Sequence, residues 1–229
     1  MNQEVFDLWP RAALGRSDFL VSPSNEAAIG WIERWPGWPM RVLLLHGPPG
    51  CGKTHLVTVW QQRAAADVIS GERLDEEGVA RLFAQARRAI AIDDADCAPE
   101  RALLHLYNAC IEGGGTLLLT ARRPPGLWRI GIDDLRSRLR AAAAVEIEAP
   151  DDALLGAVLV KHFADRRVQV APELIRYVLA RIERSFAAVR AVAVALDRAS
   201  LAQHRPITVA FASRVLDQAL PPSRESGMT

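Results

Sequence analysis

The sequence has few lysines, few cysteines and no long apolar segment. Only two of its 28 basic residues are lysine, Lys53 and Lys161, so arginine is the usual cation of this chain. The three cysteines, Cys51, Cys97 and Cys110, have neither zinc-site nor disulfide spacing, which favours reduced thiols. No apolar stretch approaches the ~18–20 residues of a membrane span, and no export signal is visible. We therefore expect a cytoplasmic protein without a membrane partner.

The charges of the chain are nearly balanced. The sequence has 28 Lys and Arg residues against 27 Asp and Glu residues, which gives a net charge of +1. This balance predicts no general attraction to DNA or to a membrane surface. Half of the 229 residues are hydrophobic, so the chain can form one large domain or a domain with a smaller appendage.

Residues 47–54 read GPPGCGKT and match the phosphate-loop pattern G-x-x-x-x-G-K-[ST] at every fixed position. An apolar run at 42–45 precedes this loop and a helical pattern follows it. Glycines allow backbone N–H groups to turn toward phosphate oxygens, and the helix N-terminus adds partial positive charge. We expect Lys53 to reach the β- and γ-phosphates and Thr54 to ligate Mg²⁺. The predicted nucleotide contacts in the loop are Gly47, Pro48, Pro49, Gly50, Cys51, Gly52, Lys53, Thr54 and His55.

Apolar strand-like segments alternate with helical patterns up to about Pro150, and only helices fit beyond it. The alternation predicts an α/β fold with a parallel, doubly wound sheet, followed by an all-helical domain. The expected strands are 42–46, 68–69, 89–92, 116–120 and 145–147. The expected division is a flexible peptide at 1–10, an α/β domain at 11–150, a helical domain at 151–220 and a disordered tail at 221–229.

Polar residues follow two of the expected strands. Asp93 and Asp94 come directly after the apolar run at 89–92. Because strand ends of parallel sheets converge on the ligand crevice, Asp93 is predicted to bind Mg²⁺. Asp94 is predicted either to orient the attacking water as a catalytic acid or merely to turn the chain. Thr120 ends the strand at 116–120, where it either senses the γ-phosphate or simply ends the strand.

The segment 121–140 is the richest in arginine, with six Arg against two Asp. Three of these arginines, Arg136, Arg138 and Arg140, alternate just before the last expected strand. Three interpretations stay open: a solvated face, contacts with DNA phosphates, or an arginine finger for a neighbour's nucleotide. A finger acts because guanidinium stabilises the charge that spreads over the γ-phosphoryl group in the transition state.

Several segments together resemble the AAA+ ATPase family, and more narrowly the ATPase core of the replication initiator DnaA. They are FLVSPSNEAA, GPPGCGKT, IDDAD, LLLTARRPP, DLRSRL and AVRAVAVALDRAS, and the resemblance spans about residues 18–220. The resemblance implies binding of ADP or ATP with Mg²⁺, and it makes the helical domain a lid. It also implies that Arg138 is an arginine finger acting on a partner's ATP and that Arg190 is a sensor contacting the chain's own nucleotide.

No helix-turn-helix domain follows the lid, and the chain starts with QEVFDL, which is similar to peptides that bind the sliding clamp. These two features resemble the Hda family of DnaA regulators. The resemblance implies that Gln3, Phe6 and Leu8 bind the sliding clamp of DNA polymerase III, with Glu4 weakening the contact, unless this segment is only a frayed terminus. It further implies stimulation of ATP hydrolysis by DnaA, DNA contact only through the clamp, a homodimer as one possible state, and a nucleoid-associated location.

Two alternatives stay open at this point. One is a self-sufficient AAA+ ATPase or helicase loader that acts on DNA as an oligomer. The other is a truncated initiator that binds the origin, which the missing DNA-binding domain disfavours. Intrinsic ATP hydrolysis is expected to be weak if the main role is to stimulate a partner.

Overall fold

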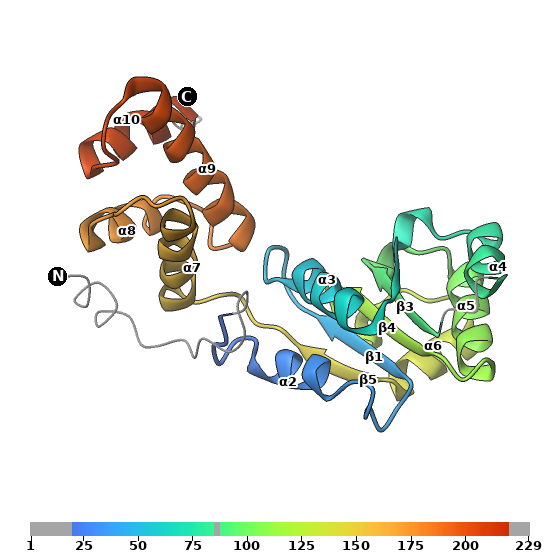
Figure 1. Cartoon of the computed structure of the whole chain (residues 1–229). Helices are drawn as coiled ribbons and strands as arrows, with labels where there is room; N and C mark the ends of the chain where they lie inside the picture. Colours follow the sequence, from blue (N-terminus) through green and yellow to red (C-terminus); the bar gives the residue numbers. More distant parts are fainter. Residues whose placement is uncertain (1–19, 85–87, 220–229) are drawn as a thin grey trace, which may run out of the picture. The chain divides into compact units, whose positions relative to one another are not determined.

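The computed structural model describes residues 20–84 and 88–219 (Figure 1). The predicted clamp-binding residues Gln3, Phe6 and Leu8 and the predicted tail at 221–229 lie outside the described residues. One compact unit comprises Pro23–Ala149, and a second one begins at Pro150. In the described part of the chain, no helix is long and apolar enough to cross a membrane.

The first unit contains a five-stranded sheet in which every neighbouring pair is parallel. The strand order is β2-β3-β4-β1-β5, which confirms the predicted doubly wound α/β fold. The central strands β3, β4 and β1 are buried along nearly all of their length, whereas β2 and β5 are half exposed, as edge strands are. The strands are β1 Val42–His46, β2 Asp67–Ser70, β3 Ala89–Asp93, β4 Thr116–Ala121 and β5 Ala143–Glu146.

Besides the strands, the described part of the first unit has five helices and three short 3₁₀ turns. The helices are α2 Glu26–Arg34, α3 Lys53–Ala64, α4 Glu76–Ala84, α5 Glu100–Glu112 and α6 Asp133–Ala141, and the turns are η1 Gly71–Arg73, η2 Ala95–Cys97 and η3 Pro125–Leu127.

Helix α6 was not anticipated from the alternating arginines. Two aspartates lie in its first turn and two arginines in its last, which matches the helix dipole, and Leu135 and Leu139 are buried four residues apart. On a helix, residues two apart point in different directions, so the arginines of this segment do not form one row.

The second unit consists of four described helices with a hydrophobic core of its own, in which Leu159, Phe163, Ile175 and Leu196 are fully buried. Side-chain oxygens cap three of these helices: Asp151 and Ser185 accept backbone N–H groups at 2.7 and 3.1 Å, and Thr208 accepts one at 3.2 Å. The last cap confirms the predicted start of the final helix. The helices are α7 Asp152–Asp165, α8 Pro172–Leu179, α9 Phe186–Gln203 and α10 Val209–Ala219.

Candidate nucleotide-binding site

The predicted phosphate loop connects the end of β1 with the first residue of α3. Gly50 and Gly52 have φ angles of 76° and 104°, in the left-handed region where a side chain would be strained. At Gly47 the reason is space, because a Cβ would lie 2.1 Å from the carbonyl oxygen of Ile147. The glycines therefore allow the tight backbone turn that a phosphate cradle needs.

Lys53 is buried inside the curl of this loop, with 7% of its surface exposed. Its ammonium group donates hydrogen bonds to the carbonyl oxygens of Gly47 at 2.8 Å and Pro48 at 2.9 Å. A buried charge needs such partners, and neutral carbonyls stabilise it less than an anion does. The ammonium is thus held at the helix N-terminus, where a bound phosphate could replace these carbonyls.

Cys51 is a buried member of the same loop, and its sulfur lies 3.8 Å from the Lys53 ammonium. Burial raises the pKa of the Cys51 thiol, and the nearby ammonium only partly opposes this effect. The thiol is therefore neutral near pH 7 and is a poor nucleophile, so its role in the loop is to pack.

Three predicted site residues from different elements form one hydrogen-bonded network. The hydroxyl of Thr54, on α3, donates to Asp93 Oδ2 at 2.7 Å, and the hydroxyl of Thr120 donates to Asp93 Oδ1 at 2.5 Å. Thr120 is fully buried and also accepts the backbone N–H of Asp94 at 2.9 Å. Strands β3 and β4 are neighbours in the sheet, so their ends place these groups together.

Asp94 has a φ of 55°, an unusual conformation for a residue other than glycine. Burial, followed by the like charges of Asp93 and Asp96, raises the pKa of Asp94, whereas Lys53 and Arg122 lower it. A strained acid with a raised pKa beside a candidate metal ligand is typical of functional sites.

His46 was not predicted as a site residue, although it directly precedes the loop at the end of β1. The side chain is buried, and burial lowers the pKa of His46; Lys53 lowers it further, while Glu146 opposes both. The imidazole at the end of β1 is therefore neutral at pH 7. Its position next to the glycine motif was the available signal in the sequence.

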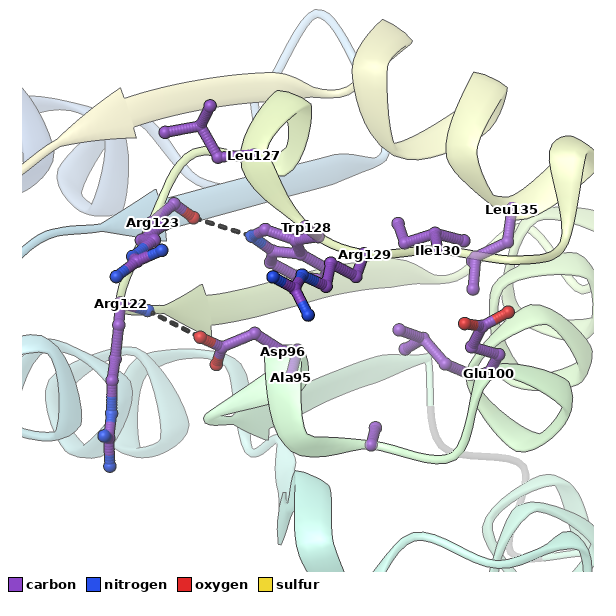
Figure 2. A pocket seen from close by; sticks show the side chains of 12 residues that line it. Ala95, Asp96, Glu100, Arg122, Arg123, Leu127, Trp128, Arg129, Ile130 and Leu135 are labelled. Carbon is purple, nitrogen blue, oxygen red and sulfur yellow. Dashed lines mark hydrogen bonds between the residues drawn. The ribbon is translucent and has the colours of Figure 1, made fainter.

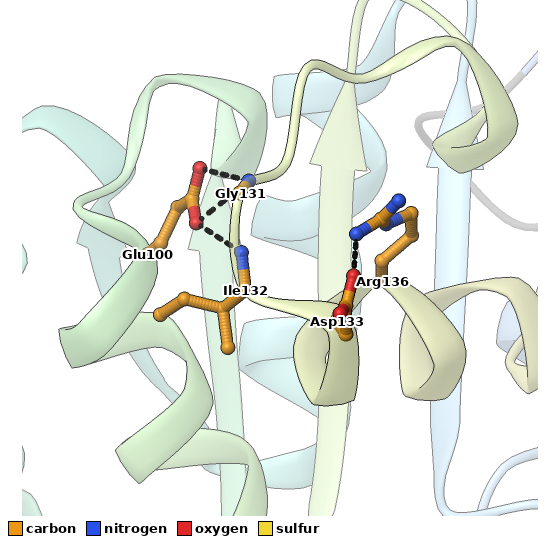
Figure 3. A network of polar contacts seen from close by, with 5 residues as sticks. All are labelled: Glu100, Gly131, Ile132, Asp133 and Arg136. Carbon is orange, nitrogen blue, oxygen red and sulfur yellow. Dashed lines mark hydrogen bonds and ion pairs between the residues drawn. The ribbon is translucent and has the colours of Figure 1, made fainter.

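Helix α6 holds its arginines through its own acidic residues. Arg138 Nε donates to Asp134 Oδ1 at 2.8 Å, and its guanidinium lies 5.8 Å from the centre of the Tyr107 ring. Arg136 is paired with Asp133 (Figure 3). In the described residues, neither partner of Arg138 belongs to the phosphate loop.

The carboxylate of Glu100, on α5, holds the segment that leads into α6 (Figure 3). It accepts the backbone N–H of Gly131 at 2.9 and 3.0 Å and that of Ile132 at 2.9 Å. These bonds lower the pKa of Glu100, so the carboxylate stays charged at neutral pH. The contact was not visible in the sequence because 31 residues separate Glu100 from Gly131.

Arg190 lies in the second unit, where it is exposed on α9. Burial lowers the pKa of His162, and the cations Arg166 and Arg190 lower it further, so Arg190 faces a positively charged part of α7. Contact between Arg190 and the chain's own nucleotide stays a prediction.

A magnesium site made of protein groups alone is not present among the described residues, since no group of three His, Cys, Asp or Glu side chains could hold a metal. Thr54 and Asp93 nevertheless offer a hydroxyl and a carboxylate that already touch each other at 2.7 Å. Mg²⁺ commonly binds one or two protein oxygens and takes its other ligands from phosphates and water. The residues present therefore fit a metal that binds together with a nucleotide.

The loop, the acid and threonine at neighbouring strand ends, and the separate helical unit define an AAA+ type of P-loop fold. The fold is similar to domain III of the replication initiation protein DnaA from Thermotoga maritima, with a TM-score of 0.76 and 19% identity over 89% of this chain and 95% of that chain. It is also similar to the Holliday junction branch migration motor RuvB of the same organism, with a TM-score of 0.71 and 18% identity over 92% of this chain and 72% of that chain.

Residues 152–216 match the family model for the lid domain of Hda. The chain is 30% identical over 227 residues to the chromosomal replication initiator protein DnaA of Thermomicrobium roseum, covering 86% of this chain and 48% of that protein. For DnaA of Cutibacterium acnes the identity is 22% over 236 residues, covering 92% of this chain and 47% of that protein. The chain thus spans about half the length of these relatives. It is an Hda- and DnaA-like AAA+ protein.

Proposed function

We propose that this protein binds an adenine nucleotide with Mg²⁺ and regulates the initiation of DNA replication. In this proposal it binds the sliding clamp and stimulates ATP hydrolysis by DnaA, which prevents over-initiation. The observation that carries the proposal is the Hda lid match at 152–216, in a chain whose other unit contains a phosphate loop with its acid and threonine network.

Each residue of the network has a role in nucleotide binding. The backbone N–H groups of the loop and the N-terminus of α3 bind the phosphates, and Lys53 exchanges its two carbonyl partners for phosphate oxygens. Thr54 and Asp93 hold Mg²⁺, which neutralises phosphate charge when it is bound. DnaA from Aquifex aeolicus, solved with AMPPCP, supports an adenine nucleotide as the ligand.

Thr120 connects the phosphate end of the site with Asp94. Its hydroxyl bridges the Asp93 carboxylate and the Asp94 backbone, so a change in the metal ligands moves both acids together. Asp94 orients the attacking water. We expect hydrolysis by the isolated chain to be weak, because an arginine finger supplied in trans accounts for a factor of ~10³–10⁵ in the rate of related enzymes.

Arg138 serves as the finger for the partner's ATP. In this structure it is held by Asp134 on the same helix, and it must exchange this carboxylate for the partner's γ-phosphate. The pair is partly exposed, with side-chain exposures of 39% and 52%, so breaking it costs only about 0–1 kcal/mol. Arg190 acts on the chain's own nucleotide and links the lid to the nucleotide state.

The clamp contact uses Gln3, Phe6 and Leu8. Two of these side chains are bulky and apolar, which suits a hydrophobic pocket on a partner. Glu4 places a charge in an otherwise apolar motif, so the contact is weak, and DNA is reached only through the clamp. The protein then acts in the cytoplasm at the nucleoid.

A different function, that of a self-sufficient ATPase motor or helicase loader, is favoured by one observation, the fold similarity to RuvB. This likeness at 18% identity concerns the fold alone. A motor would hydrolyse ATP by itself in the presence of DNA, and its rate would not depend on DnaA or on the clamp.

The deciding experiment measures ATP hydrolysis by DnaA in the presence of clamp-loaded DNA. Wild type is expected to stimulate the rate, and Arg138→Ala to lower this stimulation by ~10³-fold or more. Arg140→Ala is the matched control, since Arg140 is an exposed arginine on the same helix. Full stimulation by Arg138→Ala would exclude the finger role, and DNA-dependent hydrolysis without DnaA would favour the motor.

A further inference from the structure

A cavity of about 380 Å³ lies in the first unit, where β3 and β4 end (Figure 2). Its walls come from η2, the start of α5 and the segment that follows β4, and we call it the η2 pocket. The residues that line it belong neither to the phosphate loop nor to the network of Thr54, Asp93 and Thr120. A cavity of this size can hold one small ligand.

The carboxylate of Asp96 is a wall group of this pocket with an unused hydrogen-bonding atom. Its Oδ2 accepts the Arg122 backbone N–H at 3.1 Å. Its Oδ1 is shielded from water and accepts no hydrogen bond in the part of the chain that the structure describes. A buried acceptor without a partner costs free energy, and an ionised carboxylate can only accept. The pocket therefore favours a ligand that brings N–H donors to Asp96.

The same pocket has an aromatic and apolar wall. Trp128 is half-buried, and its indole N–H donates to the Arg123 carbonyl at 2.7 Å, which fixes the ring. Figure 2 shows the Trp128 ring and the Asp96 carboxylate lining the same space. Leu127, another lining residue, is 65% exposed, an unusual fraction for a leucine beside a cavity. Such a wall favours a flat, partly apolar ligand.

Two arginines give the pocket a positive end. Arg123 and Arg129 are exposed and take part in no ion pair within the described ranges. The Arg122 side chain points away from the Trp128 ring in Figure 2, and its charge lowers the pKa of Asp94, so we assign it to the nucleotide site. Guanidinium groups present a fork of donors that matches phosphate oxygens. The ligand therefore has an anionic group as well as N–H donors.

The two carboxylates of the pocket exclude simpler ligands. Glu100 lies at the other end of the cavity from Arg123 (Figure 2), and its oxygens already accept the backbone N–H groups of Gly131 and Ile132. Asp96 and Glu100 repel a ligand that is negative along its whole length, and the arginines repel a purely cationic one. A fitting ligand carries its negative charge at one end and its donors along another edge.

A guanine mononucleotide combines these properties. Its base is flat and presents two adjacent donors, N1–H and the N2 amino group, on one edge, and its phosphate lies at the other end of the molecule. Adenine presents one donor beside the acceptor N1, which a carboxylate repels. We infer that the η2 pocket is a second nucleotide site, in which Asp96 accepts the guanine edge, Trp128 contacts the base, and Arg123 and Arg129 bind the phosphate. This inference goes beyond the proposed function and does not rest on it.

The position of the pocket allows both sites to be filled together. Asp96 follows Asp93 by three residues, so the two sites share the end of β3. Their side chains are nevertheless different, since Lys53, Thr54 and Asp93 are not among the residues that line the pocket. A guanine nucleotide in the pocket therefore leaves the phosphate loop free for ADP.

The test is isothermal calorimetry of GMP binding to the full chain in saturating ADP, which occupies the phosphate loop. Wild type is expected to bind one GMP per chain while ADP stays bound. AMP is the matched ligand control, and we expect it to bind at least about tenfold more weakly than GMP, because it loses one donor to a charged acceptor.

Two variants test the base and phosphate contacts separately. Asp96→Asn keeps an oxygen for the Arg122 N–H but replaces one acceptor by a donor, so it should lower GMP affinity at least about tenfold and abolish the preference for GMP over AMP. R123A/R129A should weaken both mononucleotides at least about tenfold. R198A/R205A is the matched control, because it removes two exposed arginines of the helical unit, and it should bind GMP as wild type does.

ADP affinity and the thermal midpoint of each variant check that it folds. The inference is wrong if GMP displaces ADP or does not bind, if AMP binds as tightly as GMP, or if R123A/R129A and Asp96→Asn both bind GMP as wild type does. An equal loss in R198A/R205A would also contradict it. A fluorescent guanine-containing oligonucleotide is a further probe: if it binds through Arg123 and Arg129 while GMP does not bind, the pocket is a nucleic-acid interface instead.

Discussion

Replacing Thr120 by valine removes one hydroxyl from the centre of the candidate site and keeps the shape of the side chain. Thr120 is fully buried, donates to Asp93 Oδ1 at 2.5 Å and accepts the Asp94 N–H at 2.9 Å. Valine fills the same volume, so no cavity forms. The change therefore tests the hydrogen bonds alone.

The expected loss of stability follows from the two partners. The bond to the Asp93 carboxylate is charge-assisted, and such bonds contribute about 1.5–3 kcal/mol. The Asp94 N–H, part-buried, loses its acceptor, which costs about 1–3 kcal/mol. The two terms share one hydroxyl and do not add fully, so we expect Thr120→Val to lower the free energy of unfolding by about 2–4 kcal/mol.

Denaturant unfolding measures this loss, and calorimetry with ADP measures the effect on the site. Thr116→Val is the matched control at the start of the same strand, where both hydroxyl contacts are 3.3 Å long, and we expect it to cost less than about 1 kcal/mol. ADP affinity should fall in Thr120→Val only. Equal unfolding midpoints for the two variants would refute the role that we assign to the network.

Further predictions concern single site residues. Lys53→Ala should abolish most ADP affinity in calorimetry, because a charge-assisted phosphate contact is lost; unchanged affinity would overturn the phosphate-loop assignment. Asp94→Asn should unfold at higher denaturant than wild type at pH 7, since a raised pKa means that the charged form is less stable in the folded state. This difference should shrink as the pH falls through the pKa of Asp94, and a gap that grows toward acid pH contradicts the reasoning. Arg190→Ala should weaken ADP binding, and it should lower the stimulation of DnaA only as far as it lowers the nucleotide occupancy of this chain. An ADP affinity equal to that of wild type would argue against a role of Arg190 at the chain's own nucleotide. Alanine at Gln3, Phe6 and Leu8 should remove clamp capture in a pull-down and leave ADP binding intact, and surviving capture places the contact elsewhere.

Local sequence patterns were sufficient to predict much of the structure of the first unit. The phosphate loop is a contiguous motif with fixed spacing, and its strand and helix lie within a few residues of it, so the sequence predicts all three. The start of α10 at Thr208 was equally readable, because a cap is a contact over three residues. Such features depend on neighbours in the chain and need no knowledge of the rest of the fold.

Contacts between distant segments depended on the order of the strands. The sequence indicated Asp93 and Thr120 separately, but their hydrogen bond exists because β3 and β4 pair in the sheet. Strand order is decided by the packing of the whole sheet, and no local pattern encodes it. The same reason explains the contact of Glu100 with the segment before α6, which spans 31 residues.

The arginines of α6 are an example of a question that the sequence left open and the structure narrowed. Their spacing in the sequence left three interpretations open, a solvated face, a DNA contact and a finger, and only the family resemblance pointed to the finger. The structure places Arg138 on a helix, where its Nε lies 2.8 Å from Asp134 Oδ1 and its guanidinium lies beside the Tyr107 ring. The sequence by itself determined which kinds of residue this protein has for binding a nucleotide, because that chemistry is local. Only the tertiary structure decided which of them meet, because long-range contacts form when the sheet and helices pack.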